Sequence, residues 1–413
     1  MKLLFISNFY PPASRGGYEL WCQEIAENFK KKNHDVMILT SKHGKDRIST
    51  DQPNWVRRDL YLEMELNSPW NWLKFFTERN RNEHQNLLII KEIIKSFSPD
   101  FILVWGMWNL SKSILEYAEE EMAGKVVYYM GDYWPSLPNQ LVEYWGIPGK
   151  NWITSLPKRI FKRIALNMLD RENKPILKFS HVLYPTKFMR DNLAQKGYRS
   201  KESRIIPGAI DTSVYTSTDR PNLKINKDCL SLLYVGRLTH EKGVHTAIQA
   251  VQKLVNDYGR ANIILTILGS GEIEYETYLH NLVRDEGLQD LVEFAGSKDK
   301  DELPGFYQKA DMFLFTSIWP EPFGRVIVEA MASGVPVIGS ATGGASEILI
   351  NGKNSLVFQP GNSEQLAKKI IQLIDKPDLR QKISECGRNT AVEKYDIKTM
   401  AAEIEEYLTS IEI

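Results

Sequence analysis

Residues 230–236 read LSLLYVG, an apolar run of strand length. This run begins a second series of apolar runs separated by helix-length stretches, after a first series in the preceding part of the chain. The runs that follow are ANIILTILG (261–269), LVEFAG (291–296), DMFLFTS (311–317), VPVIGS (335–340) and NSLVF (354–358). The runs that precede it are LLFIS (3–7), DVMILT (35–40), FILVW (101–105), KVVYYM (125–130) and HVLYP (181–185). Helix-length stretches separate them, which is typical of βα units around a parallel sheet. The sequence therefore predicts an α/β protein with two Rossmann-like halves.

The polar stretch TSTDRPNLKINKD, 216–228, lies between the two patterns and marks the domain boundary. We expect an N-terminal domain over 1–205 and a C-terminal domain over 206–395. A helical tail should begin near residue 363, and its last helix, 396–413, should pack back on the N-terminal domain. A chain of 413 residues with 43% hydrophobic residues is long enough to bury two cores. Ligands of such sheets bind beyond the carboxyl ends of the strands.

Charge and cysteine content exclude several classes of protein. Lys and Arg number 52, as do Asp and Glu, so the formal charge is zero and nucleic acid is not an expected partner. Three distant cysteines without CxxC spacing argue against a disulfide framework and a thiolate zinc site, and fit a reducing cytosol. Since no apolar run approaches the roughly 20 residues of a spanning helix, we expect a cytoplasmic protein, soluble or peripheral on the inner face of a membrane.

Two loops of the second half contain residues suited to phosphate binding. LSLLYVG leads into GRLTHEKGV, which places Arg237 and Lys242 on a loop that opens a helix, and ILTILG leads into the glycine turn SGE. Free amides at helix starts attract anions, and Arg and Lys add positive charge. These loops predict a phosphate site. The alternative interpretation of Arg237 and Lys242 is that they are solvated loop charges.

Two carboxylates, Glu321 and Glu329, lie in the otherwise apolar run EPFGRVIVEAMASGVPVIGS, 321–340. Prolines on both sides of Glu321 stiffen the backbone there. Glu329 falls within a predicted helix among apolar neighbours, where an isolated charge would be costly. Its partner is either Arg325, one turn earlier, or a vicinal diol such as that of a ribose.

A further glycine loop follows VPVIGS. It reads ATGGASE, in which two glycines allow close backbone approach and Glu347 falls in the first turn of the next helix. Helix capping alone would also explain Glu347. Together the loops of the second half predict a site for a diphosphate that carries sugar hydroxyls at both ends.

Five motifs in combination resemble one known family across nearly the whole chain. They are PPASRGGYEL (11–20), IIPGAID (205–211), VGRLTHEKG (235–243), the E-x7-E element (321–329) and GGASE (343–347). They are similar to those of the retaining, GT-B fold glycosyltransferases of family 4, which use nucleotide-diphospho-sugars. The resemblance implies two Rossmann-like domains that face each other across a cleft, with a C-terminal helical tail.

The resemblance also implies roles for individual residues. Arg237 and Lys242 would neutralise the leaving diphosphate, Glu329 would hold the nucleotide ribose, and Glu321 would contact the transferred sugar. Asp132 would act beside that sugar. The remaining donor-binding residues would contribute mainly backbone groups near the phosphates or sugar: Gly16, Gly17, Gly236, Gly269, Phe323 and Gly324.

One position departs from the family pattern. Members usually have a His-Asp pair after the fourth strand of the first half, and here Gly131-Asp132 follows VVYYM. The contact that the histidine makes to the sugar is therefore absent or supplied by Asp132. A donor that lacks a 6-hydroxyl is one hypothesis for this glycine. A pseudoenzyme that binds nucleotide-sugar or glycan without transfer is another.

Retaining transfer in this family is expected to need no metal and no cofactor, because Arg237 and Lys242 stabilise the departing diphosphate. A literal DxD, Asp299-Lys300-Asp301, also occurs. Such pairs hold Mn or Mg in the other glycosyltransferase fold. Here the motif lies between a strand and a helix start, so we interpret it as a turn and N-cap.

Two segments of the first half are candidates for acceptor contact, 67–81 with four large aromatics and 151–169 with four basic residues. A basic helix with an apolar face can lie in a membrane interface, whereas a packed helix with a solvated basic side is the alternative. The expected partners are a UDP- or GDP-sugar donor and a glycan or lipid-linked acceptor of surface polysaccharide biosynthesis. A soluble small acceptor is the rival. A dehydrogenase is excluded, because no G-x-G-x-x-G follows the first strand.

Overall fold

The computed structural model describes residues 1–14, 16–45, 53–66, 68–149, 152–172, 174–216 and 229–411. Most of the expected boundary stretch, 217–228, lies outside these residues, as do Arg15 within PPASRGGYEL and Asn67 and Asn151, the first residues of the two candidate acceptor segments. The chain forms two compact units, each with its own parallel sheet. Unit 1 comprises Met1–Ile206 and Ala401–Ile413, and unit 2 comprises Pro207–Met400.

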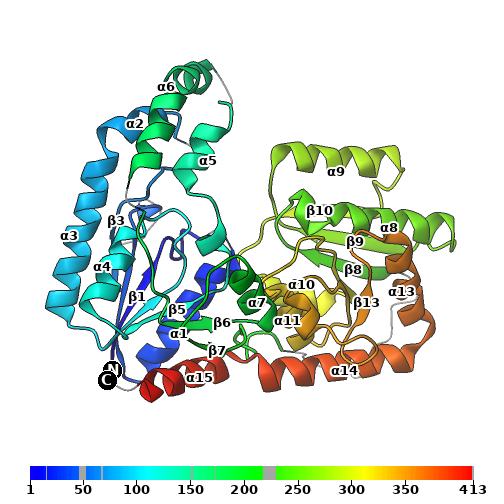
Figure 1. The fold of residues 1–413 in the computed structure, drawn as a ribbon. Helices are drawn as coiled ribbons and strands as arrows, with labels where there is room; N and C mark the ends of the chain where they lie inside the picture. Colours follow the sequence, from blue (N-terminus) through cyan, green and yellow to red (C-terminus); the bar gives the residue numbers. More distant parts are fainter. Residues whose placement is uncertain are drawn as a thin grey trace. The chain divides into compact units, whose positions relative to one another are not determined.

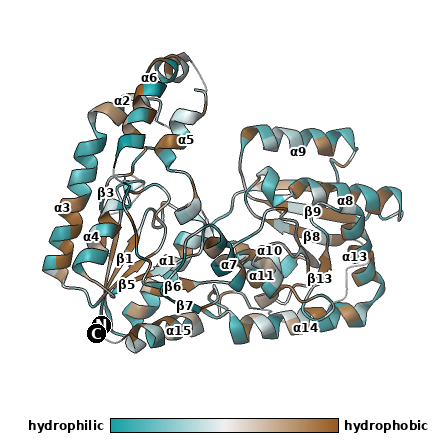
Figure 2. Ribbon diagram, viewed as in Figure 1, coloured by the Kyte–Doolittle hydropathy of each residue, from teal (hydrophilic) through white to brown (hydrophobic). Residues whose placement is uncertain are grey.

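Unit 1 contains a seven-stranded parallel sheet in its described part, with strand order β3-β2-β1-β4-β5-β6-β7 (Figure 1). The strands are β1 (Lys2–Ser7), β2 (Asp35–Ser41), β3 (Val56–Leu60), β4 (Phe101–Val104), β5 (Val126–Tyr129), β6 (His181–Tyr184) and β7 (Glu202–Ile205). Central strands such as β1 and β4 are mostly or wholly apolar, and Figure 2 shows hydrophobic colour on β1. Helices on both faces require such apolar strands.

The helices of unit 1 connect successive strands or extend beyond the sheet. They are α1 (Gly17–Lys31), α2 (Asn71–Thr77), α3 (Arg79–Phe97), α4 (Ser113–Glu121), η2 (Trp134–Ser136), α5 (Gln140–Gly146), α6 (Trp152–Arg171) and α7 (Lys187–Gln195). Helices α3 and α4 pack on the sheet in one core, whereas α2, α5 and α6 bury a separate small cluster around Phe75, Trp145 and Leu169. We call α2, α5 and α6 the helical lobe of unit 1.

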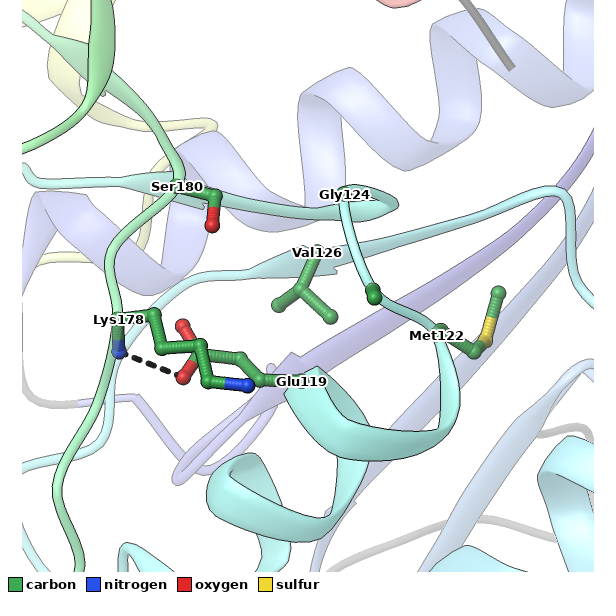
Figure 3. Close-up of a pocket in the computed structure, with 7 residues that line it drawn as sticks. Glu119, Met122, Gly124, Val126, Lys178 and Ser180 are labelled. Atoms are coloured by element: carbon green, nitrogen blue, oxygen red, sulfur yellow. Dashed lines mark hydrogen bonds between the residues drawn. The ribbon is translucent and has the colours of Figure 1, made fainter.

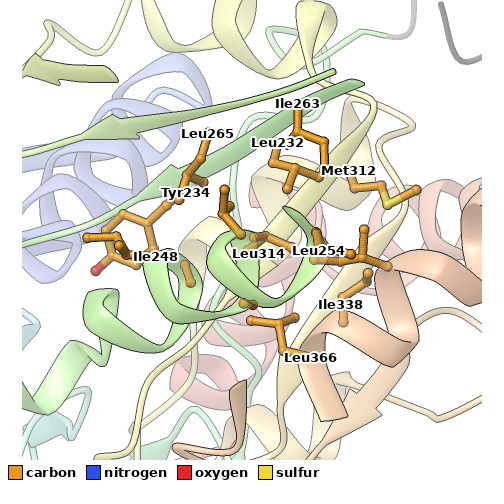
Figure 4. Packing of buried hydrophobic residues seen from close by; sticks show 14 of the residues in the cluster. Leu232, Tyr234, Ile248, Leu254, Ile263, Leu265, Met312, Leu314, Ile338 and Leu366 are labelled. Atoms are coloured by element: carbon orange, nitrogen blue, oxygen red, sulfur yellow. The ribbon is translucent and has the colours of Figure 1, made fainter. Parts of the chain in front are cut away.

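Unit 2 repeats the architecture with the strand order β10-β9-β8-β11-β12-β13 among its described residues. Its strands are β8 (Leu230–Val235), β9 (Ile263–Leu268), β10 (Val292–Gly296), β11 (Met312–Phe315), β12 (Val337–Ser340) and β13 (Leu356–Phe358). Its helices are η3 (His240–Lys242), α8 (Val244–Asn256), α9 (Ile273–Asp285), α10 (Leu303–Lys309), α11 (Arg325–Ala332), α12 (Ala345–Ile348), α13 (Ser363–Asp375) and α14 (Pro377–Lys394). Figure 4 shows side chains of the strands and of α8 meeting in its core, among them Leu232, Leu265, Leu314 and Ile248.

The last helix, α15 (Ile397–Ser410), carries the chain back into unit 1. Its Glu405 accepts hydrogen bonds from Lys32 at 2.6 Å and contacts His34 at 2.7 Å, and Tyr407 contacts His181 at 3.0 Å. His34 immediately precedes β2. The helix also buries Ile404 and Leu408 completely.

The sheet topology confirms the α/β fold class, and every predicted apolar run forms a strand. Two strands were missed, β3 with the sequence VRRDL and β7 with ESRI. Both are edge strands of unit 1 with few apolar residues, and most of their polar side chains are at least partly exposed, although Arg58 of β3 is buried. A search for apolar runs could not detect them for this reason.

Candidate active site

The strand orders locate a ligand crevice in each unit. In unit 2, β8 lies between β9 and β11. The chain adds β9 and β10 on one side of β8, and then adds β11, β12 and β13 on the other side. Such a switch point opens a crevice at the carboxyl ends of the strands, where α/β proteins bind ligands. The loops that border it are 236–243 after β8 and 316–324 after β11. The second loop begins the E-x7-E element.

Glycines bring the backbones of neighbouring loops into contact at this edge. A Cβ on Gly243, which has a φ of +64°, would lie 2.2 Å from the carbonyl oxygen of Thr316. A Cβ on Gly269 would lie 1.9 Å from the carbonyl oxygen of Gly236. The hydroxyl of Thr316 donates to the Lys242 carbonyl at 2.9 Å, which fixes the same contact. The loops after β8, β9 and β11 therefore form one continuous backbone surface.

Lys242 and Glu321 form an ion pair across this surface. The ammonium of Lys242 lies 2.5 Å from Oε1 of Glu321, and the side chains are 20% and 9% exposed. The hydroxyl of Ser317 donates to the same oxygen at 2.7 Å. The resemblance implied that Lys242 binds the diphosphate and Glu321 the sugar, and nothing in the sequence indicated that the two would pair or that Ser317 would join them.

Arg237 is exposed at the same edge, directly after β8. Its carbonyl accepts a hydrogen bond from Tyr234 at 3.1 Å, which fixes the backbone. Its guanidinium forms no ion pair with any residue that the structure describes. Because Lys242 is already paired, Arg237 provides the open positive charge of this crevice.

The loop after β12 holds the backbone of Glu321. The amide of Gly344 donates to the Glu321 carbonyl at 2.6 Å, and a Cβ on Gly343 would lie 2.5 Å from the same oxygen. Phe323 is buried against Tyr395, and Gly324 precedes α11 with a φ of +117°. Glu347 lies in the first turn of α12, as predicted. The GGASE motif thus supports the E-x7-E element.

Glu329 is buried in α11 and has two partners. Its Oε1 accepts a hydrogen bond from Nε of Arg325 at 2.9 Å, and its Oε2 accepts one from the hydroxyl of Tyr307 at 3.0 Å. The ion pair that the sequence offered as one partner is therefore present. Burial, followed by the charge of Glu329, raises the pKa of Tyr307 well above its ordinary value. A carboxylate has about four acceptor sites, so two bonds leave capacity for a diol.

Unit 1 has its own switch point, between β1 and β4. Gly16 and Gly17 lie after β1, where α1 begins, and the amide of Gly16 donates to Oε2 of Glu19 at 3.0 Å. The amide that the resemblance placed near the phosphates thus has a partner within its own helix start. The loops after β4 and β5 border the same crevice.

Asp132 lies in the loop after β5 and is half-buried. Its Oδ1 accepts a hydrogen bond from the Trp134 amide at 3.1 Å. Burial raises the pKa of Asp132 to about 7; the bond from Trp134 lowers it and the charge of Glu19 adds to the rise. The preceding residue, Gly131, is covered by the ring of Tyr18, a residue that the sequence patterns did not single out.

The DxD motif forms the predicted turn, because the Glu302 amide donates to the Asp299 carbonyl at 3.0 Å. The predicted capping role is wrong. Glu302 occupies the N-cap of α10 and makes no side-chain capping bond. Across the described residues no group of three His, Cys, Asp or Glu side chains is arranged to hold a metal ion.

A pocket elsewhere in unit 1 is structural in character. Figure 3 shows Glu119 from α4 beside Val126 and Ser180. These lie at the amino ends of β5 and β6, opposite the edge where ligands bind. The Glu119 carboxylate accepts hydrogen bonds from the amides of Lys178 at 2.7 Å and Phe179 at 3.0 Å. Its acceptors are used to join α4 to the segment before β6.

The two predicted acceptor segments meet in the helical lobe. Trp72 of α2 stacks on Phe161 of α6, with ring centroids 6.1 Å apart. Lys158 and Lys162 donate to the carbonyls of Ile147 and Gly146, both at 3.1 Å. The packed interpretation therefore holds for this side of α6. Along the described chain, no helix combines the length and apolarity that a membrane span requires.

Comparison with known proteins extends these observations. The model of Glycosyl transferases group 1 matches residues 216–390, and that of Glycosyltransferase Family 4 matches residues 15–214. An uncharacterized glycosyltransferase of Methanocaldococcus jannaschii is 32% identical over 410 residues, 98% of this chain and 96% of that protein. The lipopolysaccharide core biosynthesis glycosyltransferase LpsE of Rhizobium meliloti is 33% identical over 195 residues, 47% of this chain and 54% of that protein.

Among solved structures, Anabaena Alr3699/HepE in complex with UDP-glucose superposes with a TM-score of 0.70 at 23% identity, covering 99% of this chain and all of that one. The two doubly wound sheets and this superposition therefore show the GT-B fold. More narrowly, the chain belongs to glycosyltransferase family 4, whose members are retaining, typically metal-independent enzymes that use nucleotide-sugars.

Proposed function

We propose that this enzyme transfers a sugar from a UDP-sugar to a glycan or lipid-linked glycan of surface polysaccharide biosynthesis, at the cytoplasmic face of a membrane. The unpaired guanidinium of Arg237 beside the glycine-lined loops of unit 2 carries the donor part of this proposal. The UDP-glucose complex of the Anabaena protein favours UDP over GDP as the nucleotide. The similarity to LpsE favours a glycan acceptor.

In this proposal the loops of unit 2 stabilise the charge of the leaving UDP. Arg237 binds the diphosphate through its planar guanidinium, and Lys242 shares its charge between Glu321 and the phosphate. Ser317 and the loop after β12 keep Glu321 in place for contact with the sugar. Glu329 accepts from the ribose hydroxyls. Preorganised charge of this kind lowers the barrier without reorganisation during the reaction.

The donor site is tested by thermal shift with UDP, GDP, ADP and dTDP in EDTA. A ligand that binds the native state raises Tm by mass action. We expect UDP alone to give a large shift, and Arg237→Ala to abolish it. Arg260→Ala is the matched control, because Arg260 is exposed but precedes β9 at the opposite edge of the sheet. The role of Arg237 would be refuted if UDP still raised the Tm of Arg237→Ala, or if UDP raised the Tm of no protein, the wild type included.

The acceptor part of the proposal depends on one side of α6. Leu156, Ile160, Ile164 and Met168 follow one another at intervals of four along the helix and are 55%, 58%, 54% and 39% exposed. We call these four residues the α6 face. Figure 2 shows hydrophobic and hydrophilic residues alternating along this helix.

Two arginines accompany the α6 face. Arg159 and Arg163 are exposed and follow Leu156 and Ile160 by three residues, so they are neighbours on the helix surface. Neither forms an ion pair with a described residue. Exposed aliphatic side chains bordered by unpaired guanidinium groups match an anionic lipid surface in both polarity and charge. A membrane that contains the acceptor is therefore the proposed occupant.

Co-sedimentation with vesicles tests this surface. We expect the protein to sediment with phosphatidylglycerol–phosphatidylcholine vesicles at low salt, and not with phosphatidylcholine alone. Ile160→Glu/Ile164→Glu should lose the binding. Ile273→Glu/Val392→Glu is the control, since these residues are also exposed, at 77% and 43%, but lie in unit 2. Equal sedimentation of all variants, or none by the wild type, would favour a soluble acceptor.

A further inference from the structure

A short segment after β3, residues 61–65, is fixed by three buried asparagine side chains. Each asparagine donates to the backbone carbonyl of one residue and accepts from the amide of the same residue, at distances between 2.7 and 3.2 Å: Asn86 with Tyr61, Asn109 with Met64, and Asn71 with Glu65. Glu63 lies inside this segment, and its amide donates to the Asn109 carbonyl at 3.0 Å. The backbone is thus bonded on both sides of Glu63, which fixes the direction of its side chain.

Glu63 lines a shallow pocket between this segment and α3. The other polar side chains of its lining include Tyr61, Arg79, Asn82, Glu83 and Ser111. The space in the pocket, with its open mouth, is about 270 Å³. This volume is just below the range of roughly 300–1,000 Å³ that drug-sized ligands occupy, so the pocket suits the edge of one small ring. Its residues follow β3 and β4 or belong to α3, whereas the predicted donor contacts of unit 1 follow β1 and β5.

The charges around the pocket balance. Glu63 and Glu83 supply two carboxylates, and Arg79 and the nearby Lys112 supply two cationic groups. Burial raises the pKa of Glu63 to about 7, while the charge of Arg79 lowers it, that of Glu83 raises it and that of Lys112 lowers it. A bound anion would be repelled by both carboxylates, and a bound cation by both cationic groups. A neutral ligand therefore fits this pocket better than an ion.

Hydrogen-bond donors and acceptors alternate around Glu63. Among the described residues, neither Glu63 nor Lys112 forms an ion pair, and the Lys112 ammonium lies 5.5 Å from the centre of the Trp134 ring. The hydroxyl of Ser111 donates to Oε1 of Glu83 at 2.7 Å, and the half-buried amide of Asn82 is on the same wall. A hydroxyl group both donates and accepts, so a ring that carries several hydroxyls can satisfy carboxylate, ammonium and amide together.

The pocket lies at the base of the helical lobe. The guanidinium of Arg79 donates through two nitrogens to the carboxylate of Glu172, directly after α6. Asn139, the N-cap of α5, forms a hydrogen bond with Glu63. The side chains around the pocket thus join the segment after β3 to the lobe that carries the α6 face. Both surfaces suited to a lipid-linked glycan therefore belong to unit 1.

We propose that this pocket binds one neutral sugar ring of the acceptor, with the Glu63 carboxylate accepting from two neighbouring hydroxyls. Asn82 and Lys112 donate to hydroxyl oxygens of the same ring. This inference rests on the proposed function, because it takes the acceptor to be a glycan, and it adds where a sugar of that glycan is held. Burial has removed water from the Glu63 carboxylate, so hydroxyls that replace this water form strong, charge-assisted hydrogen bonds.

Saturation-transfer NMR with methyl glycosides of glucose, galactose, mannose and N-acetylglucosamine tests the pocket. We expect at least one glycoside to bind the wild type. Glu63→Gln and Asn82→Ala should each raise its Kd about tenfold or more, because hydroxyls of the bound ring lose their partners. Both variants should fold, since Gln preserves the size of Glu63 and Ala is favourable within α3.

Two matched controls lie close to the pocket in sequence. Glu65→Gln changes an exposed carboxylate of the same segment, which pairs with Lys74. Gln85→Ala shortens an exposed amide side chain of the same helix, three residues after Asn82. Both controls should bind the glycoside as the wild type does. Equal weakening in the controls and the pocket variants would overturn the assignment to this pocket.

Thermal shift with UDP, measured on the same samples, separates this inference from the proposed donor. Every variant should keep the UDP shift, because Arg237 and its loops belong to unit 2. Glycoside binding that Glu63→Gln and Asn82→Ala retain would leave a glycan acceptor in place and overturn the pocket. A wild type that binds UDP and no glycoside would also overturn the pocket. Pocket-dependent glycoside binding without any UDP shift would refute the proposed donor alone.

Inorganic phosphate and MgCl2 test the argument from charge balance. We expect neither to raise the Tm of the wild type through this pocket. A rise in Tm with phosphate or with Mg²⁺ that Glu63→Gln changes would show that the pocket holds an ion. That result would overturn the assignment to a neutral sugar.

Discussion

At the residue scale, the buried carboxylate of Glu329 has both a structural and a proposed functional task. Glu329→Ala would remove the buried carboxylate that pairs with Arg325, whose side chain is 8% exposed. Breaking a buried pair by removing one member costs about 3 kcal/mol or more. We therefore expect a clearly lower urea midpoint for Glu329→Ala in equilibrium unfolding.

The matched control is Glu364→Ala, which removes a carboxylate paired at the same helical spacing with Lys368. The two side chains of that pair are 59% and 61% exposed, so its loss should leave the urea midpoint nearly unchanged. Equal loss of stability in both variants would contradict the burial argument. Since Glu329→Ala perturbs the fold, Glu329→Gln is the better variant for testing ribose binding.

Asp132 should make stability depend on pH. Burial raises the pKa of Asp132 from its ordinary value of 3.8 to about 7, so between these pH values the folded state binds a proton that the unfolded state has released. Stability from this group therefore falls as pH rises from about 4 to about 7, and the full penalty is present above that range. We expect Asp132→Asn to raise Tm relative to the wild type at pH 8 and much less at pH 4.5.

Asp290→Asn is the control, because Asp290 is exposed and should show no such difference. Burial also raises the pKa of Glu63 to about 7, but Glu63 is present in both proteins and cancels in the comparison. A Tm difference for Asp132→Asn that is independent of pH would contradict the raised pKa.

At the scale of elements, glycines in unit 2 allow the backbones of neighbouring loops to approach closely. Their absence of a side chain matters there in addition to their backbone conformation. Gly243 and Gly287 have nearly the same φ, +64° and +68°. A Cβ on Gly243 would collide with the Thr316 carbonyl, whereas nothing lies within 4 Å of one on Gly287. Substitution by Ala therefore adds the same backbone strain at both positions, of order 1 kcal/mol, and a collision at only one.

We expect Gly243→Ala to lose stability well beyond Gly287→Ala and to lose UDP binding, because the loops after β8 and β11 must separate. Urea unfolding gives the first quantity and calorimetric titration with UDP the second. If the two variants unfolded at the same midpoint and bound UDP equally, the loops would not depend on this contact.

At the scale of the whole molecule, the chain enters unit 2 at Pro207 and returns to unit 1 at Ala401. Ile404→Asp would place a charge at a fully buried position of α15. An unpaired buried charge is strongly destabilising, so we expect unit 1 to unfold at lower urea. UDP binding by unit 2 should survive above that midpoint, at urea concentrations where unit 1 is already unfolded. Unfolding is followed by tryptophan fluorescence and binding by calorimetry.

Thr409→Asp is the control, since Thr409 is exposed on the same helix. It should leave unfolding unchanged. Parallel loss of UDP binding and of unit 1 structure in Ile404→Asp would show that the two units unfold together and would contradict the prediction.

The amino-acid sequence by itself determined the fold class and the family. Apolar runs of strand length and glycine loops such as GRLTHEKG are local patterns, and a parallel α/β sheet is built from them in chain order. The same locality explains the misses. Polar edge strands β3 and β7 have no apolar run, and α10 begins after Glu302, one residue beyond the DxD motif that was expected to cap it.

Only the tertiary structure decided which side chains meet. The pair of Lys242 with Glu321 and the cover of Gly131 by Tyr18 join residues from different βα units. No local pattern encodes such partners, because side-chain proximity depends on the order in which strands lie in the sheet. The sequence thus specified a crevice with charges at its edge. Packing determined that the guanidinium of Arg237 stays without an ion pair among the described residues. It also determined that the ring of Tyr18 covers Gly131, where the family pattern has a histidine.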